Sequence, residues 1–241
     1  GMRLRQHDLF WLDNICCEDV GLRLQGPVSF SSPQAKVDTL SVPGRNGDIH
    51  FFDGSYANIS GSARCFALAQ ERVDLALSTI VGWCLAAPGY HRLSVSDEPD
   101  FYRLARISTG PKTEIRMRVL APFELTFDCK PQRFSRLGEW PVLYKAPGRL
   151  RNPYMFASEP LVKITGSGPG TVQIGTYPVK ILELDGHIML DSRTQNAYRG
   201  TENKNTAIQA AEFPRLAPGE NEIAWSGGVE SVEITPHWWT L

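Results

Sequence analysis

The chain of 241 residues lacks most features that mark a membrane protein or a nucleic-acid-binding protein. No apolar run reaches the roughly 18 residues that a membrane-spanning helix needs, and the N-terminal residues lack the apolar core of a secretory signal. Net charge is −1, with 18 basic and 16 acidic residues in the first 150 positions and 7 and 10 in the rest. Neither part is basic enough to neutralise phosphates. We therefore expect neither a membrane nor a nucleic acid as a partner.

Cysteine and histidine are scarce and scattered. The odd number of cysteines and the absence of a CxxC pair argue against zinc, redox chemistry or a disulfide framework, and favour reduced thiols. Cys129 lies on the apolar face of an expected strand and Cys84 on the apolar face of an expected helix. At such positions a free cysteine packs like a small hydrophobic side chain. The histidines form no HExxH motif and no pair at ligand spacing. The sequence therefore predicts no bound metal.

Catalytic motifs are also missing. There is no GxSxG elbow and no nucleotide-binding loop. The segment Gly166–Gly170 superficially resembles a phosphate loop, but we expect it to join two strands, with no helix to supply a dipole. Asp97, Glu98 and Asp100 could serve as paired carboxylates or calcium ligands, yet Pro99 among them favours a solvated turn. We expect no catalytic residue and no cofactor.

Most of the chain has the period of β-strands. Apolar residues alternate with polar ones over Ile115–Val119 and again over Phe123–Cys129, which predicts an antiparallel pair with one buried face. Upstream, Pro-Gly and Asn-Gly lie within Val42–Ile49 between apolar flanks. These dipeptides predict that the chain reverses there.

One helix is expected among the strands of the first part. From Gln70 to about Leu85, apolar residues recur at helical spacing, and Pro88-Gly89 ends the pattern. A single amphipathic helix among strands must lay its apolar stripe on a sheet, which predicts an α+β first domain. The stripe consists of Val73, Leu77, Ile80, Val81 and Cys84.

The second part is expected to be all β. The stretch Trp140–Pro160 is rich in Pro, Gly and Arg, lacks periodicity and is interpreted as a boundary between domains 1–150 and 151–241. Ser192–Ala211 is polar and predicts a long loop with room for one helical turn. Short strands between turns predict a sandwich. The expected strands are Leu161–Thr165, Thr171–Ile174, Val179–Leu182, His187–Leu190, Glu222–Trp225 and Ser231–Ile234, with turns at Gly166–Gly170, Asp185-Gly186 and Ser226–Gly228.

Three tryptophans near the C-terminus raise the question of sugar stacking. Trp225 shares the apolar face of its strand with Ile223 and is expected in the core. Trp238 and Trp239 are adjacent and would point to opposite faces of a strand. One of them is therefore expected in the core or a subunit contact, or else exposed as a platform for a sugar ring.

Several blocks along the chain resemble the siphophage distal tail protein (Dit) family. Val42–Asp48 is similar to the family's "PGR-x-G" signature, which follows an N-terminal strand region and precedes the helix, as here. Phe123–Pro131 is similar to the "F-x-C-x-P" stretch that closes the family's first domain. The resemblance covers nearly the whole chain in order. Its other blocks are Trp83–Leu85, Pro88–Leu93, Asp97–Tyr102, Val162–Gly168, Leu190–Ser192 and Phe213–Ile223.

The resemblance implies a mainly β protein in which an N-terminal β-barrel-like, α+β domain with one helix precedes a galectin-like β-sandwich. It implies a homo-oligomeric ring, typically a hexamer, in the tail of the virion of a free phage or a prophage. The ring would join the tail tube protein to tail-tip or baseplate proteins. Some larger relatives carry inserted carbohydrate-binding modules, for which a chain of 241 residues has no room.

The candidate site implied by the resemblance is a structural or interface turn formed by Pro43, Gly44, Arg45 and Gly47. Gly44 and Gly47 allow backbone angles that other residues avoid. Arg45 either makes a charged contact within or between subunits or is a solvated turn residue. Two other classes of function stay open, namely a carbohydrate-binding sandwich for host attachment and an enzyme such as a glycosidase.

Overall fold

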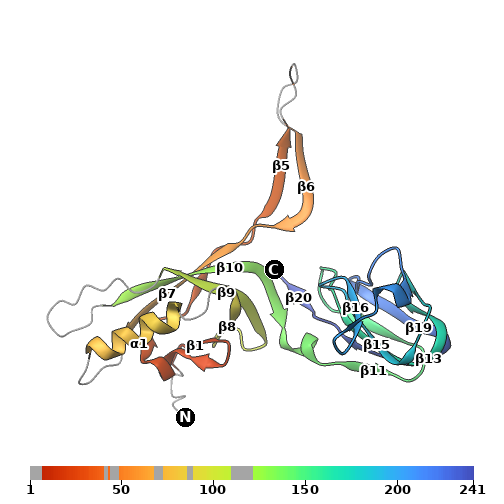
Figure 1. The fold of residues 1–241 in the computed structure, drawn as a ribbon. Helices are drawn as coiled ribbons and strands as arrows, with labels where there is room; N and C mark the ends of the chain where they lie inside the picture. The colour runs from red at the N-terminus through yellow and green to blue at the C-terminus, as the bar shows by residue number, and fades with distance from the viewer. Residues whose placement is uncertain (1–6, 41–42, 44–48, 68–72, 86–88, 110–121) are drawn as a thin grey trace, which may run out of the picture. The chain divides into compact units, whose positions relative to one another are not determined.

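The structure is a computed structural model that describes residues 7–40, 43, 49–67, 73–85, 89–109 and 122–241. The chain forms two compact units, one of Gly1–Arg133 with Leu241 and one of Phe134–Thr240 (Figure 1). The stretch Trp140–Pro160 lies within the second unit. The domains 1–150 and 151–241 stay a prediction about which parts of the chain fold independently.

The first unit is built on one antiparallel sheet with the strand order β2-β1-β8-β9-β10-β7-β3. In addition, β4 pairs with β7. Strand β20 (Trp239–Thr240), which lies in the second unit, pairs with β10, the strand on which the boundary between the two units falls. The other elements are β1 (Phe10–Leu12), β2 (Ile15–Cys16), the 3-10 helix η1 (Cys17–Val20), β3 (Leu22–Leu24), β4 (Ser29–Phe30), β5 (Ala35–Leu40), β6 (Ile49–Tyr56), β7 (Ile59–Ala67), α1 (Val73–Leu85), β8 (His91–Val95), β9 (Phe101–Thr109) and β10 (Phe123–Ser135).

The alternation that predicts a strand over Phe123–Cys129 is confirmed in β10. Leu125, Phe127 and Cys129 are fully buried, while the residues between them lie on the opposite face. The strand continues beyond the prediction to Ser135, and it pairs with β7 so that Phe127 lies opposite Gly61. The partner that the sequence predicts at Ile115–Val119 falls outside the described residues.

The predicted helix is present as α1, and it packs against the sheet as its apolar stripe requires. Ile80 is fully buried, and Trp83 and Cys84 pack against the core of the first unit. Trp83 stacks on Phe10 at 5.8 Å between ring centroids, and Phe10 in turn meets the edge of Phe127 at 5.5 Å. These contacts join the helix to both β1 and β10 through one aromatic cluster.

Strands β5 and β6 form a two-stranded sheet of their own (Figure 1). Their antiparallel register places Leu40 opposite Ile49 and shifts between Ala35 and Val37. The chain therefore reverses between Leu40 and Ile49, which confirms the reversal that the turn dipeptides predict.

The second unit is a β-sandwich organised around two long antiparallel strands, β13 (Leu161–Ile174) and β19 (Gly219–Thr235), which pair over most of their length. Ile164 and Val172, in the two halves of β13, are both fully buried in one core. Over the described residues, the expected mainly β fold with one α-helix is confirmed. The remaining elements are η2 (Arg136–Glu139), β11 (Val142–Tyr144), β12 (Gly148–Asn152), β14 (Tyr177–Ile181), β15 (Asp185–Asp191), β16 (Asn196–Arg199), β17 (Glu202–Asn203), η3 (Asn205–Ala207) and β18 (Ile208–Gln209).

The turns that the sequence predicts at Gly166–Gly170 and Ser226–Gly228 are wrong. Both segments lie inside continuous strands, where the pairing of β13 with β19 shifts register. A Cβ on Gly170 would lie 2.5 Å from the carbonyl oxygen of Ser226, and a Cβ on Gly227 would lie 2.6 Å from that of Pro169. Glycine is therefore present because two backbones approach closely at an irregular point of the sheet, not because the chain reverses.

Two further expectations for the second unit need correction. The expected polar loop Ser192–Ala211 contains the short strands β16, β17 and β18 as well as one turn of 3-10 helix, η3. The expected turn Asp185-Gly186 instead begins β15. The polar composition of these segments matches strands with an exposed face, whose residues pair through backbone groups whatever their side chains.

Candidate assembly surface

The motif that the family resemblance singles out falls between β5 and β6 in the sequence. Pro43 is an exposed turn residue. Gly44, Arg45 and Gly47 fall outside the described residues, so the predicted role of this turn stays a prediction.

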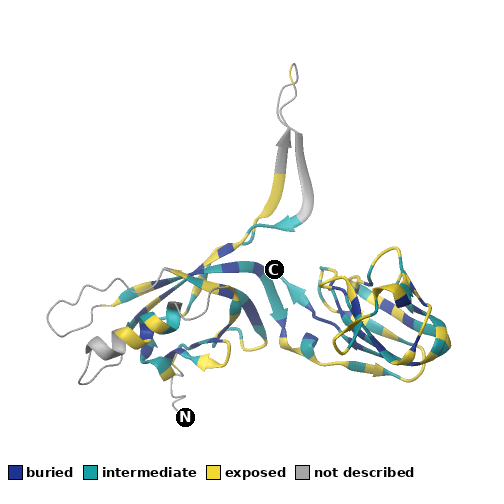
Figure 2. Cartoon of the chain, viewed as in Figure 1, coloured by how far each residue is buried: buried dark blue, intermediate teal, exposed yellow. Residues whose placement is uncertain are grey.

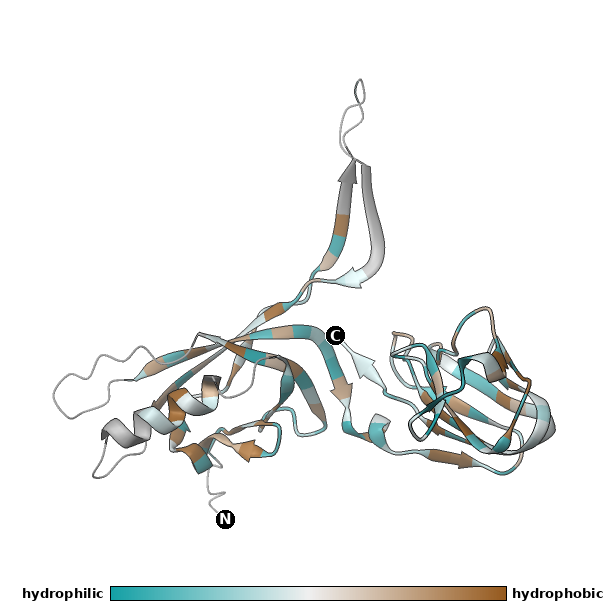
Figure 3. Ribbon diagram, viewed as in Figure 1, coloured by the Kyte–Doolittle hydropathy of each residue, from teal (hydrophilic) through white to brown (hydrophobic). Residues whose placement is uncertain are grey.

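The described side chains at the start of β5 are exposed on both faces of the strand. Ala35, Lys36 and Val37 are consecutive residues of β5, and all three are exposed (Figure 2). Consecutive side chains of a strand point to opposite faces, so neither face is covered here. Val37 is an exposed apolar residue of this strand, with 46% of its surface open to solvent. Figure 3 shows apolar as well as polar positions along β5. An isolated two-stranded hairpin is marginally stable in water, and this one would gain stability from a surface to pack against.

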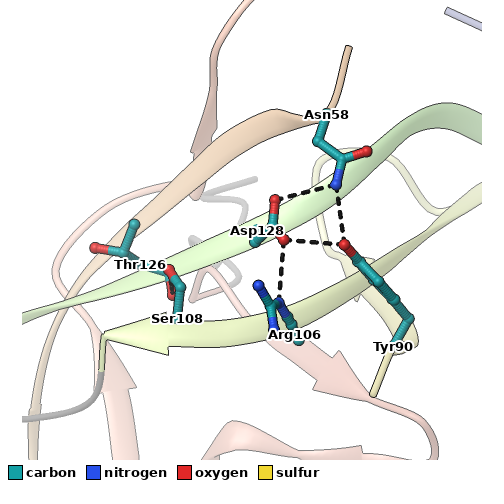
Figure 4. Close-up of polar contacts among 6 residues, drawn as sticks. All are labelled: Asn58, Tyr90, Arg106, Ser108, Thr126 and Asp128. Carbon is teal, nitrogen blue, oxygen red and sulfur yellow. Dashed lines mark hydrogen bonds and ion pairs between the residues drawn. The ribbon is translucent and has the colours of Figure 1, made fainter. Parts of the chain in front are cut away.

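A polar network lies on the other side of the first sheet from its core (Figure 4). The carboxylate of Asp128 on β10 is its centre. Oδ2 accepts hydrogen bonds from Tyr90 Oη at 2.9 Å and from Arg106 Nε at 3.1 Å, while Oδ1 accepts one from Asn58 Nδ2 at 3.3 Å. Asn58 Nδ2 also donates to Tyr90 Oη at 2.9 Å. The ammonium group of Lys130 lies 4.5 Å from the centre of the Tyr90 ring.

The electrostatics of this network follow from its donors. Partial burial opposes ionisation of Asp128, but the bonds from Tyr90, Arg106 and Asn58 outweigh it and lower the pKa of the carboxyl group. The bond to Asp128 raises the pKa of Tyr90, and burial adds to the shift. Asp128 is therefore ionised, and its carboxylate holds together side chains of β9, β10 and the adjoining loops. In the sequence, the only indication of a role for Asp128 is that it is one of the polar residues that alternate with buried ones along β10.

The acidic turn Asp97–Asp100 is present, but Glu98 is not a free solvated residue. Its Oε1 lies 3.4 Å from both Arg103 Nη2 and Arg133 Nη1. The guanidinium of Arg103 is buried and stacks on Phe30 at 4.0 Å. Arg133 also donates to the backbone oxygen of Leu241 at 2.8 Å. The turn therefore contributes one carboxylate to a structural ion cluster rather than a pair of carboxylates to a catalytic centre.

The cysteines divide by burial. Cys17, Cys65 and Cys129 are buried, Cys16 and Cys84 are half-buried, and all five are free thiols. Burial raises the pKa of Cys17 and Cys65 to about 12 and that of Cys84 and Cys129 to about 11. Over the described ranges, no three His, Cys, Asp or Glu side chains gather in a way that could hold a metal ion.

Three of the four tryptophans of the second unit are engaged within it. Trp225 packs against the core, as the sequence predicts. Trp238 keeps only 7% of its surface exposed, so its ring offers no face to a sugar. Trp239 stacks on Phe156 at 4.6 Å between centroids and donates its indole N–H to the backbone oxygen of Ala157 at 3.1 Å. Trp140, which the sequence analysis did not single out, is 71% exposed.

The architecture has a clear counterpart among solved structures. The Dit protein (gp 19.1) of SPP1, described as a paradigm of the hub adsorption apparatus of phages that infect Gram-positive bacteria, superposes with a TM-score of 0.74. The match covers 98% of this chain and 100% of that one, at 12% sequence identity. This chain has the fold of SPP1 Dit.

The match spans both units, so the Dit fold extends over the helix-bearing sheet and the sandwich together. No family model matches the sequence, and no curated protein matches it. Among the residues that the structure describes, no helix is long and apolar enough to cross a membrane.

Proposed function

We propose that this chain is a structural component of the tail of a long-tailed phage or prophage, where it forms a ring between the tail tube and the tail-tip or baseplate proteins. The observation that carries the proposal is the match to SPP1 Dit over the whole of both chains. A partial match could reflect a sandwich shared by many unrelated proteins. A match through two successive units supports a shared architecture and hence a shared place in the virion tail.

The β5–β6 hairpin supports assembly into a ring of identical subunits. A ring uses heterologous contacts, in which one surface of each subunit meets a different surface of its neighbour. The start of β5, where Ala35, Lys36 and Val37 are exposed on both faces of the strand, supplies one of these two surfaces. We place the ring contacts in residues 1–150, which include the hairpin and the Pro43–Gly47 turn, and propose a hexamer. Residues 151–241 then form a galectin-like domain that projects outward.

This role requires no catalytic residue, cofactor, metal, nucleic acid or membrane. The ion clusters around Asp128 and Glu98 have structural partners, and each fixes several elements of the first unit. The burial of Trp238 and the stacking of Trp239 on Phe156 argue against the Trp238–Trp239 pair as a sugar platform.

Immunogold electron microscopy of the phage particles that carry this protein tests the proposal. Antibodies against the chain should label the end of the tail that is distal to the capsid, with one gold cluster per particle. Labelling along the whole tail, on the capsid or on no particle would contradict the proposal. A particle population that lacks this chain, with tails that end without a tip complex, is the matched control.

A further inference from the structure

Residues 236–240, which we call the closing segment, return to the stretch with which the second unit begins. Two backbone hydrogen bonds hold them there. The N–H of Ser135 donates to the carbonyl oxygen of Trp238 at 2.9 Å, and the N–H of His237 donates to the carbonyl oxygen of Gly138 at 2.8 Å. The closing segment therefore ties down the start of the second unit.

The closing segment is in close contact with η2. A Cβ on Gly138 would collide with the backbone nitrogen of Trp238, and it would lie 3.2 Å from the carbonyl carbon of His237. Pro236, His237 and Trp238 are three consecutive buried residues. Because both the backbone and the side chains of these residues are packed, the closing segment is an integral part of the second unit at neutral pH.

His237 is a titratable group within this contact. It keeps 9% of its surface exposed, and its ring nitrogen Nδ1 lies 2.8 Å from the backbone oxygen of Glu159. A carbonyl oxygen only accepts hydrogen bonds, so Nδ1 carries the proton and Nε2 of the neutral ring does not. Uptake of a second proton at Nε2 would place a full positive charge on a largely buried ring.

The charges around the ring of His237 act in both directions. Burial disfavours the protonated ring most strongly and lowers the pKa of His237 from its ordinary value of 6.5. The bond to the backbone of Glu159 and two nearby carboxylates oppose this shift, while Arg193 adds to it. The ionisable groups on the segments around the ring are Arg136 and Glu139 on η2, Glu159 just before β13, and Asp191 and Arg193 at the end of β15.

The direction of the pH effect follows from this lowered pKa. When the closing segment detaches, the ring of His237 becomes exposed and its pKa returns to the ordinary value. Protons therefore bind more readily to the open segment than to the closed one, and acid favours opening. The stabilisation is complete above about pH 6.5, and it is lost as the pH falls from there through the lower pKa of the closed state.

We propose that His237 makes the closing segment a pH-sensitive tie, which holds the start of the second unit at neutral pH and opens locally in mildly acidic solution. Opening breaks the backbone hydrogen bonds to Ser135 and Gly138 and exposes Trp238, while the core of the sandwich stays folded. The proposal concerns the second unit alone and does not depend on the ring.

Amide hydrogen exchange of the full chain, followed by mass spectrometry of its peptides, measures this opening. We expect the closing segment and residues 135–138 to be less protected than the peptide that contains Val172, in the core, because the tie opens by itself. After correction for the intrinsic effect of pH on exchange, their protection should fall at least about threefold between about pH 7.5 and about pH 5.5.

Two variants show whether His237 is the group that titrates. Residue 237 has a φ of 56°, in the left-handed region, which asparagine also tolerates. The side-chain amide of His237→Asn can still donate to the backbone of Glu159 but does not titrate, so this variant should lose the fall in protection. His187→Asn, which removes the histidine on β15, should keep it. Circular dichroism checks that both variants are folded.

NMR titration of the histidine rings in the unchanged protein gives a test that needs no variant. The ring of His237 should titrate with a midpoint below 6.5, and the amide signal of Trp238 should shift with the same midpoint. The proposal would be overturned by a midpoint at or above 6.5, by protection that does not fall in acid, or by the same fall in His237→Asn. It would also be overturned if His187→Asn abolished the fall, or if the closing segment were as protected as Val172.

Discussion

The close crossing of β13 and β19 allows a prediction whose size follows from the structure. Replacing Gly170 with alanine would place a Cβ 2.5 Å from the carbonyl oxygen of Ser226 and 3.0 Å from Cγ2 of Val229. An ordinary carbon–oxygen contact is about 3.4 Å or longer, so the two strands must separate by nearly an ångström at a point where both are paired. The obstructing oxygen belongs to the backbone and cannot rotate away.

We expect Gly170→Ala to lower the free energy of unfolding of the second unit by about 2 to 3 kcal/mol, in the range of overpacked cores. For a unit of about a hundred residues this corresponds to a fall in melting temperature of about 10 °C. Urea and thermal unfolding, followed by tryptophan fluorescence, measure the effect. Trp140, Trp225, Trp238 and Trp239 report on the second unit.

Two alanine substitutions serve as controls for Gly170→Ala. A Cβ on Gly168 meets no atom within 4 Å, but its φ of +80° disfavours alanine, so the cost should be about 1 kcal/mol. Gly82 lies inside α1 with open space around it, so alanine there should stabilise the first unit by about 0.5 to 1 kcal/mol. The steric argument is refuted if Gly170→Ala costs no more than Gly168→Ala.

Three further predictions concern charges and thiols. Glu98→Gln should destabilise the first unit by about 2 kcal/mol because it leaves the buried Arg103 without its anion. Glu222→Gln, whose partner Arg149 is exposed, should cost under about 1 kcal/mol. Equal losses of stability for the two variants in urea unfolding would contradict this prediction. The pKa of Asp128 is lower in the folded protein than in the unfolded chain. Asp128 therefore contributes its whole stabilisation at a pH above the ordinary carboxyl pKa, and this stabilisation is lost as the pH falls through the pKa of the folded state. Asp128→Asn should therefore flatten the fall in melting temperature below about pH 4, and an unchanged acid profile would argue against the network. At pH 8, Ellman's reagent should react promptly with at most Cys16, because burial raises the pKa of the other four thiols. Prompt reaction of all five in native protein would be inconsistent with that core.

Features set by periodicity were predictable from the sequence. The alternation at Leu125, Phe127 and Cys129 reports a half-buried strand, and the helical spacing of Ile80 and Cys84 reports the stripe that packs on the sheet. Turn dipeptides between β5 and β6 also act locally, and the reversal that they predict is present.

Features set by distant backbone were not predictable. The segments 166–170 and 226–228 have the glycine-rich composition of turns. Glycine is required there because the backbones of the two segments, some 60 residues apart in the sequence, approach each other closely. Similarly, Glu98 looks like a solvated turn residue until Arg103 and Arg133 are placed beside it. The exposure of Trp140 and Leu143 was also not predictable, because they lie in a stretch without periodicity and their environment depends on the pairing of β11 with β19.

The most direct test of the proposed hub is a cryo-electron-microscopy structure of tails that contain this chain. We expect a closed ring of identical subunits at the end of the tail tube, with the β5–β6 hairpin of each subunit packed against the next and Val37 buried in that contact. Subunits that do not close into a ring, or a ring in which residues 151–241 make the contacts while the hairpin stays in solvent, would contradict the account.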